Sequence, residues 1–357
     1  MANAGKLLCM GNPLLDISAV VTQEFLDKYS LKLDNQILIE TDEQRAIFPD
    51  MTKNFEVEYI AGGATQNSAR VAQWMLGDAG AVTYMGCVGK DDFSAKMLEV
   101  AQKDGMVARY MEDESAATGS CAVCVVGGER SLAANLAAAN NYKIDHLKKP
   151  ENWACVEKAS FYYMAGFFIT VSPESILAVA EHSTANRKTF MMNLSAPFIM
   201  EVPPFKEALM KAMPHIDFLF GNESEAATFA TTEGWETRDV AEIALKIADF
   251  PKAAGTRPRV VVFTQGADAT VVACGGKVMS YPVIKLAKEQ LVDTNGAGDS
   301  FVGGFLSQLV AGKGLEECCR AGNYCANAVI KESGCKYPAK PNFTDATAPH
   351  QAATWSK

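Results

Sequence analysis

The first 60 positions alternate polar and apolar residues in a way that is typical of β-strands. Successive side chains of a strand point to opposite faces, so this period of two predicts extended segments at 6–10, 16–21, 37–40 and 56–60. After Gly62 and Gly63 the spacing changes. Ala69 and Ala72 belong to an apolar set at helical intervals, which predicts a helix over 65–76.

From about residue 159, strand and helix patterns alternate regularly. The first of the helices has Ser172 at its cap and Pro173 at its first position. The predicted strands are 161–164, 189–194, 217–220 and 260–264, and the later predicted helices are 205–213, one from 223, 239–250, 297–310 and 315–330. This order is typical of βαβ units, so we expect an α/β fold with a central, mostly parallel sheet flanked by helices.

The early strands and an extended pair at 118–126 and 130–136, which turns at Gly127 and Gly128, do not fit that sheet. Their alternation gives each strand one polar face that we expect to contact water, so we assign them to a small β-sheet lid that stands off the main domain. The predicted large α/β domain comprises 1–11, 63–114 and 141–345, the discontinuous lid comprises 12–62 and 115–140, and a surface tail comprises 346–357.

Composition excludes several classes of protein and partner. With 48% hydrophobic and 21% charged residues, the chain is globular, not disordered or fibrous. The net charge is −9 and no run of Lys or Arg is present, so we expect no nucleic acid and no membrane as partner. The longest apolar stretch, 161–171, is shorter than the ~20 residues of a membrane span. Without a signal-peptide pattern, we expect a cytoplasmic location, with or without a nuclear pool.

The ten cysteines are expected to be thiols, because a chain of this size needs no disulfide framework. The one Cys-x-x-Cys motif, Cys121 and Cys124, falls in a strand pattern, where positions three apart face opposite ways. A zinc site there is disfavoured. The four histidines are scattered, so a histidine-based triad also lacks support.

The segment from Asp293 to Phe301, Asp-Thr-Asn-Gly-Ala-Gly-Asp-Ser-Phe, carries the strongest chemical signal. Small residues allow a tight turn into a helix, so that the N–H groups of about Ala297, Gly298 and Asp299 form an anion hole that starts at Gly296. The Asp299 carboxylate beside it is placed to act as a base. The alternative is a glycine-rich helix start whose acid only stabilises the helix dipole.

Other phosphate-binding motifs do not match this segment. Phe301 stands where the dinucleotide-binding fingerprint has its third glycine, and the segment lies near the end of the chain instead of after the first strand. A nicotinamide-dependent oxidoreductase is therefore disfavoured. No Gly-x-x-x-x-Gly-Lys-Ser/Thr sequence is present either, which argues against a P-loop protein.

Two of these segments together resemble a known family. Residues 293–299 resemble the C-terminal signature of the ribokinase-like (PfkB) sugar and nucleoside kinases, and Gly62-Gly63-Ala64-Thr65-Gln66-Asn67 resembles their N-terminal signature. The resemblance implies a ribokinase-like fold and transfer of a phosphoryl group to an alcohol. Further segments between about Leu8 and Pro341 resemble the eukaryotic adenosine-phosphorylating members, namely 11–17, 131–136, 166–175, 193–198 and 221–225.

Asp16, which follows an Asn-Pro turn, is a candidate to bind the alcohol that receives the phosphoryl group. A carboxylate there can accept hydrogen bonds from both hydroxyls of a vicinal diol. The alternative is an acid that caps a turn. The resemblance implies that Asp16 holds the ribose hydroxyls with Gly63 and Asn67, and that Asn12, Leu14 and Ala64 line the nucleoside site. Ala64 stands where a serine is common in the family.

An apolar slot for the purine is expected where residues two positions apart on a strand point to the same side, on each of two strands. The expected slot residues are Gln36, Leu38, Leu132, Ala134 and Phe168. For Phe168 the alternative is an ordinary core residue.

The donor site is expected at the carboxyl ends of the parallel strands. Asn222 and Glu225 follow one strand, and Glu225 is a candidate to hold Mg²⁺ through water; the alternative is a helix N-terminal acid. The resemblance assigns Thr264, Gly266 and Asn295 to ATP and Asn323 to its adenine. Arg130 would reach the phosphates when the lid closes, unless it is a solvated turn residue.

The expected activity is ATP-dependent, Mg²⁺-assisted phosphorylation of the 5′-hydroxyl of adenosine, giving AMP and ADP, as in purine salvage. A kinase for another nucleoside or for a sugar such as ribose is the first alternative. A non-catalytic nucleoside-binding protein is the second, although it would not need Asp299. We expect a monomer.

Overall fold

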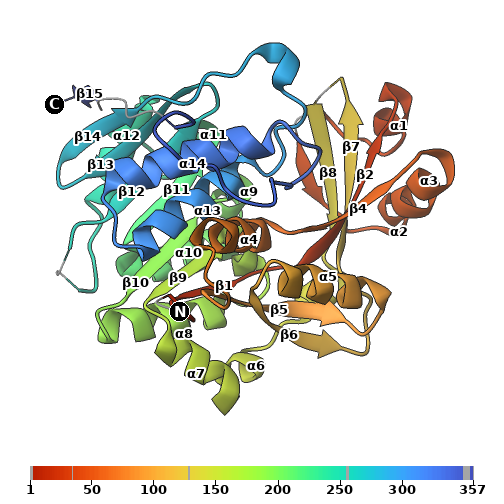
Figure 1. The fold of residues 1–357 in the computed structure, drawn as a ribbon, viewed down its shortest axis with the longest axis horizontal. Coiled ribbons are helices and arrows are strands. Elements are labelled where there is room, and N and C mark those ends of the chain that lie inside the picture. Colours follow the sequence, from red (N-terminus) through yellow and green to blue (C-terminus); the bar gives the residue numbers. More distant parts are fainter. Residues whose placement is uncertain (1–2, 34, 128, 255–256, 349–353, 357) are drawn as a thin grey trace.

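The chain folds around two β-sheets that stand side by side (Figure 1). The computed structural model describes residues 3–33, 35–127, 129–254, 257–348 and 354–356. The larger sheet has the strand order β15-β14-β13-β12-β11-β10-β9-β1-β5-β6. Its strands are β1 (Leu7–Met10), β5 (Val82–Gly89), β6 (Val107–Asp113), β9 (Phe161–Ala165), β10 (Thr189–Asn193), β11 (Phe218–Asn222), β12 (Val260–Gln265), β13 (Asp268–Cys274), β14 (Lys277–Tyr281) and β15 (Thr354–Ser356).

The strands from β6 through β12 in this order are parallel, and β13, β14 and β15 add antiparallel strands at one edge. The predicted mostly parallel α/β architecture is therefore confirmed. The sequence pattern missed β6, β13, β14 and β15.

Helices cover both faces of the large sheet, because side chains of each strand alternate between two cores. Tyr162 and Met164 of β9 pack in one core, whereas Tyr163 packs in the other. Helices α4 (Ala64–Leu76), α5 (Asp92–Lys103), α13 (Ala297–Val310) and α14 (Leu315–Val329) lie on the Tyr163 side. The opposite layer contains α6 (Ile144–Lys148), α7 (Pro150–Lys158), α8 (Pro173–Ala185), α9 (Phe198–Glu201), α10 (Pro203–Ala212), α11 (Glu223–Thr232) and α12 (Val240–Ala248).

Short 3₁₀ turns complete the large part of the fold at η1 (Ala137–Asn141), η2 (Gly166–Thr170), η3 (Met213–His215) and η4 (Lys288–Gln290).

The smaller sheet has the order β3-β8-β7-β2-β4. Its strands are β2 (Leu14–Val20), β3 (Gln36–Leu38), β4 (Glu58–Gly62), β7 (Ser120–Val126) and β8 (Glu129–Asn135). These strands come from the two segments assigned to the lid. The domain boundaries and the movement of a lid stay predictions.

One expectation about the small sheet was wrong for β2, whose polar side chains do not point to bulk water. Asp16 and Ser18 of β2 are buried, because this face turns toward the large sheet. The other face packs its apolar residues against helices that the sequence pattern did not predict. These helices are α1 (Gln23–Lys28), α2 (Asp42–Arg45) and α3 (Ile47–Asn54).

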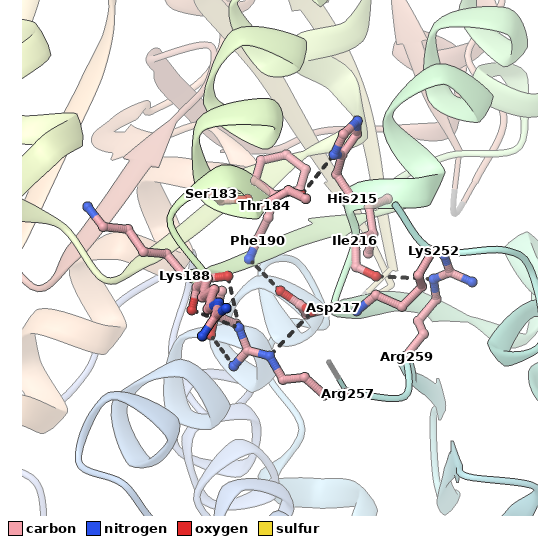
Figure 2. Close-up of polar contacts among 12 residues, drawn as sticks. Ser183, Thr184, Lys188, Phe190, His215, Ile216, Asp217, Lys252, Arg257 and Arg259 are labelled. Carbon is pink, nitrogen blue, oxygen red and sulfur yellow. Dashed lines mark hydrogen bonds and ion pairs between the residues drawn. The ribbon is translucent and has the colours of Figure 1, made fainter. Parts of the chain in front are cut away.

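Polar side chains tie together the amino ends of β10, β11 and β12 (Figure 2). The Asp217 carboxylate accepts a hydrogen bond from the Phe190 N–H at 3.0 Å and pairs with Lys252. The fully buried Arg259 guanidinium donates to main-chain oxygens of Ile216, Met213, Ile247, Phe250 and Pro251. This network fixes one end of the sheet and leaves the carboxyl ends for a ligand site.

The thiols and the tail can now be placed. The ten cysteines are free, and Cys121 and Cys124 pack in different clusters on opposite sides of β7, as predicted. Of the predicted tail, 349–353 and 357 lie outside the described residues, while Thr354–Ser356 pairs with β14. Among the helices that the structure describes, none has the length and apolar character to cross a membrane.

Candidate active site

A cavity of about 520 Å³ lies between the carboxyl ends of the large sheet and the inner face of the small sheet. It is lined by most of the predicted site residues. These are Asn12, Leu14, Asp16, Gln36, Leu38, Gly63, Ala64, Asn67, Arg130, Leu132, Ala134, Phe168, Asn222, Glu225, Thr264, Gly266, Asn295, Gly296, Gly298 and Asp299. Ala297 and Asn323 are not part of the lining.

The predicted anion hole is a helix start in the structure. Gly296 caps α13 with φ +75°, a left-handed conformation that glycine adopts without strain. The Ala297 N–H donates to the Thr294 carbonyl at 3.2 Å, so the predicted set of free donors must be corrected. Within the described chain, no hydrogen bond engages the N–H groups of Gly298 and Asp299. A Cβ on Gly298 would meet no atom within 4 Å, so this glycine leaves room for a ligand and not for protein packing.

Three carboxyl groups that line the cavity have raised pKa values, and Asp299 and Asp16 are two of them. Burial raises the pKa of Asp299 to about 6, while a hydrogen bond from Asn67 opposes the shift. Burial, and next the charge of Asp299, raise the pKa of Asp16 to about 7, while Arg130 opposes the rise. Strongly perturbed carboxyls in a cavity are typical of functional sites.

The Asp16 carboxylate occupies space that would hold a side chain if residue 62 were not a glycine. Asp16 pairs with Ile60 across β2 and β4, and a Cβ on the neighbouring Gly62 would overlap the Asp16 carboxylate. Gly63 has φ +95°, and its Cβ would collide with the Asn12 carbonyl. Both glycines of the N-terminal signature are therefore required by the wall of the site.

Asn12 and Asn67, which belong to the cavity lining, each have a buried side-chain oxygen without a hydrogen-bond partner among the described residues. The Asn12 amide donates to the Phe167 carbonyl at 3.3 Å, and the Asn67 amide donates to Asp299 at 3.0 Å. Their Oδ1 atoms are buried and accept no hydrogen bond from any residue that the structure describes. Because an unsatisfied buried oxygen is costly, these two atoms are candidates to bind donors of a ligand.

The apolar slot forms where β3 pairs with β8. Gln36 lies opposite Leu132, and Leu38 lies opposite Ala134. Phe168 is fully buried and contacts the ring of Tyr142 edge-on at 5.4 Å, yet it also lines the cavity. The two interpretations of Phe168 are therefore compatible, because a core residue can present one surface to the site.

Asn222 and Glu225 close the amino end of α11. The Asn222 side chain accepts from the Glu225 N–H at 2.8 Å, and the Glu225 carboxylate accepts from the Asn222 N–H at 3.0 Å. The helix-terminal alternative for Glu225 is thus realised. Glu225 also lines the cavity, and burial raises its pKa to about 7. Thr264 lies near the carboxyl end of the adjacent strand, β12, and Gly266 follows that strand.

A model of the pfkB family of carbohydrate kinases matches residues 26–342. The chain belongs to the pfkB carbohydrate kinase family. Adenosine kinase 1 of Arabidopsis thaliana is 62% identical over 339 residues, which are 95% of this chain and 98% of that protein.

Solved structures give the same picture. The Anopheles gambiae adenosine kinase in complex with P1,P4-di(adenosine-5) tetraphosphate has a TM-score of 0.92 and 44% identity, covering 95% of this chain and 99% of that one. The Schistosoma mansoni adenosine kinase in complex with 2-fluoroadenosine has a TM-score of 0.90 and 33% identity, covering 94% and 98%.

Arg130 of this pfkB-family chain is not a solvated turn residue. It is 5% exposed and forms an ion pair with Asp293, which is completely buried. Its guanidinium also donates to Ser18 of β2 at 3.3 Å and to Ser333 after α14 at 3.2 Å. Arg130 therefore connects the small sheet to the segment that precedes the anion hole.

Arg130→Met should destabilise the fold, because Asp293 would remain buried without its partner. Removing one member of a buried pair typically costs about 3–5 kcal/mol. The control is Lys90→Met, since the Lys90–Glu114 pair is largely exposed and its loss should change little. Urea unfolding compares the two variants, and equal midpoints would contradict the structural weight given to Arg130.

Some lining residues were not assigned from the sequence, among them Asn193 at the end of β10 and Ser195 just after it. Their position at the carboxyl end of a predicted strand was an available signal. Ser195 has φ +70°, an uncommon conformation for a non-glycine residue, and its hydroxyl accepts from the Gly166 N–H at 2.8 Å. Further unassigned lining residues include Asn35, Thr65, Cys121, Leu136, Phe167, Thr170, Phe198 and Glu223.

Proposed function

We propose that the protein transfers the γ-phosphoryl group of ATP to the 5′-hydroxyl of adenosine, giving AMP and ADP. Its family makes it a phosphotransferase that acts on an alcohol group. Adenosine kinases that match more than nine-tenths of the chain support adenosine and ATP as the substrates. The observation that carries the proposal is the single cavity that holds Asp16, the apolar slot and the start of α13.

Asp16 would fix the acceptor by accepting hydrogen bonds from the two ribose hydroxyls. The purine would lie in the slot between Leu38, Leu132 and Phe168, where flat apolar surfaces favour stacking. Asn12 and Asn67 each offer a buried oxygen for further donors. Together these contacts orient the 5′-hydroxyl toward the start of α13.

Asp299 would accept the proton of the 5′-hydroxyl as the general base. The N–H groups of Gly298 and Asp299, at the positive end of α13, would stabilise charge on the phosphoryl group in transfer. Arg130 would add its positive charge when it moves toward the phosphates. Asn222, Thr264, Gly266 and Asn295 would contact the donor. Asn323 lies beside a smaller pocket that Tyr281 and Pro282 line, and there it would contact the adenine of ATP.

Glu225 fits a magnesium ion that keeps most of its water. Over the described residues, no group of three or more His, Cys, Asp or Glu side chains is placed to hold a metal. A single carboxylate on the cavity wall suits Mg²⁺, which is held mainly by phosphates and water. When bound, the ion would neutralise phosphate charge. The monomeric state and the cytoplasmic location expected from the sequence also remain proposals.

Adenosine should be turned over in preference to inosine, ribose or fructose in a coupled assay of ADP release. The slot suits a purine and leaves a bare sugar poorly packed, so we expect ribose to lose at least ~10² in kcat/KM. The control is Asp299→Asn purified in the same way, because ADP release by that preparation measures contaminating kinases. Turnover of ribose without turnover of adenosine would favour the sugar-kinase alternative, and no turnover at all would favour a binding protein.

A further inference from the structure

Helix α4 holds Asp299 by two consecutive residues. The Asn67 amide nitrogen donates to the Asp299 carboxylate Oδ2 at 3.0 Å. The hydroxyl of the next residue, Ser68, donates to the Asp299 carbonyl oxygen at 2.9 Å. One residue thus contacts the carboxylate and the other contacts the main chain that carries it. Both are buried, with Asn67 4% and Ser68 0% exposed.

A glycine on α13 allows this approach. A Cβ on Gly303 would lie 2.6 Å from the Ser68 carbonyl oxygen and 2.6 Å from the Val71 Cβ. Real Cβ atoms do not come so close, so a larger residue would push α4 away from α13. The contact lies one helical turn beyond Asp299, so Gly303 sets the distance at which Asn67 meets the carboxylate.

The amide of Asn67 is oriented by its partner. A carboxylate only accepts hydrogen bonds, so Nδ2 must face Asp299 and Oδ1 must face away. Oδ1 is buried and accepts no hydrogen bond from any described residue, and Asn67 is part of the cavity lining. A donor of the substrate that binds Oδ1 would therefore fix the same amide that orients Asp299.

We infer that Asn67 and Ser68 are positioning residues for Asp299: Asn67 orients its carboxylate and couples that orientation to the bound substrate, and Ser68 fixes its main chain. This inference rests on the proposed function, in which Asp299 is the base. Asn67 then has two separable roles, as a substrate ligand through Oδ1 and as a positioning residue through Nδ2.

The Asn67 amide also favours the form of Asp299 that can take a proton. A hydrogen bond donated to a carboxylate stabilises the charged form and lowers its pKa. The other titratable groups that interact with the charge of Asp299 are Asp16 of β2, Tyr163 of β9, Glu225 of α11 and Cys335 after α14. A variant of Asn67 leaves all four side chains in place, and the acid limb is taken from kcat, which reports the complex in which the proposed ribose contacts already occupy Asp16.

Asn67→Asp separates the two roles, because it keeps an acceptor for the substrate and replaces the donor by a second negative charge. Like charges disfavour ionisation, so the acid limb of the kcat–pH profile should move up by at least ~1 pH unit. At pH 6, kcat should fall by about 5-fold or more, whereas the KM for adenosine at pH 8.5 should stay within about threefold of wild type. If Asn67→Asp does not fold, Asn67→Leu removes the donor without adding charge, and its limb should move in the same direction.

Ser68→Ala tests the main-chain contact. It should lower kcat by roughly 3–10-fold, without a shift of the acid limb, because misplaced reacting groups slow the reaction while the carboxylate keeps its hydrogen bond. The matched control is Ser307→Ala, which removes an equally buried α13 hydroxyl bonded to a main-chain oxygen at 2.7 Å. Ser307 does not line the cavity, so its kcat should equal that of wild type.

Different results would contradict the positioning role of Asn67 and Ser68 and the role of Asp299 as the base. An Asn67→Asp profile that coincides with that of the wild type, or equal effects of Ser68→Ala and Ser307→Ala, would overturn the positioning role while leaving Asp299 as the base. Normal turnover by Asp299→Asn would instead overturn the base assignment in the proposed function.

Discussion

Asp299→Asn should lower kcat by at least ~10²-fold while adenosine still binds. A general base commonly contributes ~10²–10⁴ in rate. A loose phosphoryl-transfer transition state needs less of its base, because the hydroxyl is hardly deprotonated when the bond to the leaving group breaks. Misorientation of the 5′-hydroxyl adds a further cost of roughly 10². The ribose and purine contacts proposed for Asp16 and the slot lie elsewhere, so binding should persist.

Single-turnover kinetics beside equilibrium binding of adenosine measure the two effects separately. The control is Asp92→Asn, which also removes a carboxylate from the first turn of a helix, α5, but does not line the cavity. If Asp299 only stabilises the dipole of α13, the two variants should behave alike, with near-normal turnover and a small loss of stability.

The parts of the site that follow from local sequence were predictable. The sequence predicted that α13 starts at residue 297, and the structure has it there. Gly296 and the small residues around it allow the tight turn that precedes the helix. The strands β9, β10, β11 and β12 also followed from their apolar runs. Their carboxyl ends lie together for a topological reason, so the donor side of the cavity could be proposed without coordinates.

The contacts that give the site its chemistry were not predictable in this way. Asn67 and Asp299 are 232 residues apart in sequence, and no local pattern indicates that their side chains meet. Arg130 and Asp293 are also far apart in sequence, and a hairpin arginine is ordinarily solvated. Both contacts arise from close packing of whole elements, such as α4 on α13 at Gly303.

The helices of the small domain illustrate a second limit. The helix α3, Ile47–Asn54, buries only Ile47 and Met51 against the sheet, and α2 buries none of its residues. Such short helices carry too few apolar positions for a helical period to be visible, so their existence depends on the sheet that they cover. The polar positions of β2 were misinterpreted for a related reason, since a ligand cavity and bulk water favour the same residue types.

Asp16→Asn should weaken adenosine binding and, in the absence of ligand, stabilise the protein. Each ribose hydroxyl that loses a charged acceptor costs about 1.5–3 kcal/mol, so two of them correspond to roughly a 10²–10⁴-fold higher Kd for adenosine. The donor site lies apart from Asp16, so the Kd for ATP should hardly change. Calorimetric titration with each ligand tests this difference, and equal losses for both would contradict the diol assignment.

The stability effect of Asp16→Asn has the opposite sign because the wild-type carboxyl is held in an unfavourable place. Burial raises its pKa from 3.8 to about 7. A carboxyl whose pKa is higher in the folded than in the unfolded chain does not lower the free energy of unfolding below pH 4, where it is protonated in both states. As the pH rises to 7 the free energy of unfolding falls, because the carboxyl ionises more readily in the unfolded chain. The neutral amide avoids this loss, so the gain in unfolding free energy should be on the order of a few kcal/mol at pH 8 and close to zero at pH 4. Thermal unfolding of both proteins across this range decides the matter, with Asp92→Asn as the exposed control. A variant less stable than wild type at pH 8 would mean that Asp16 makes stabilising contacts as an anion, and that its charge is not kept for a ligand at the expense of the fold.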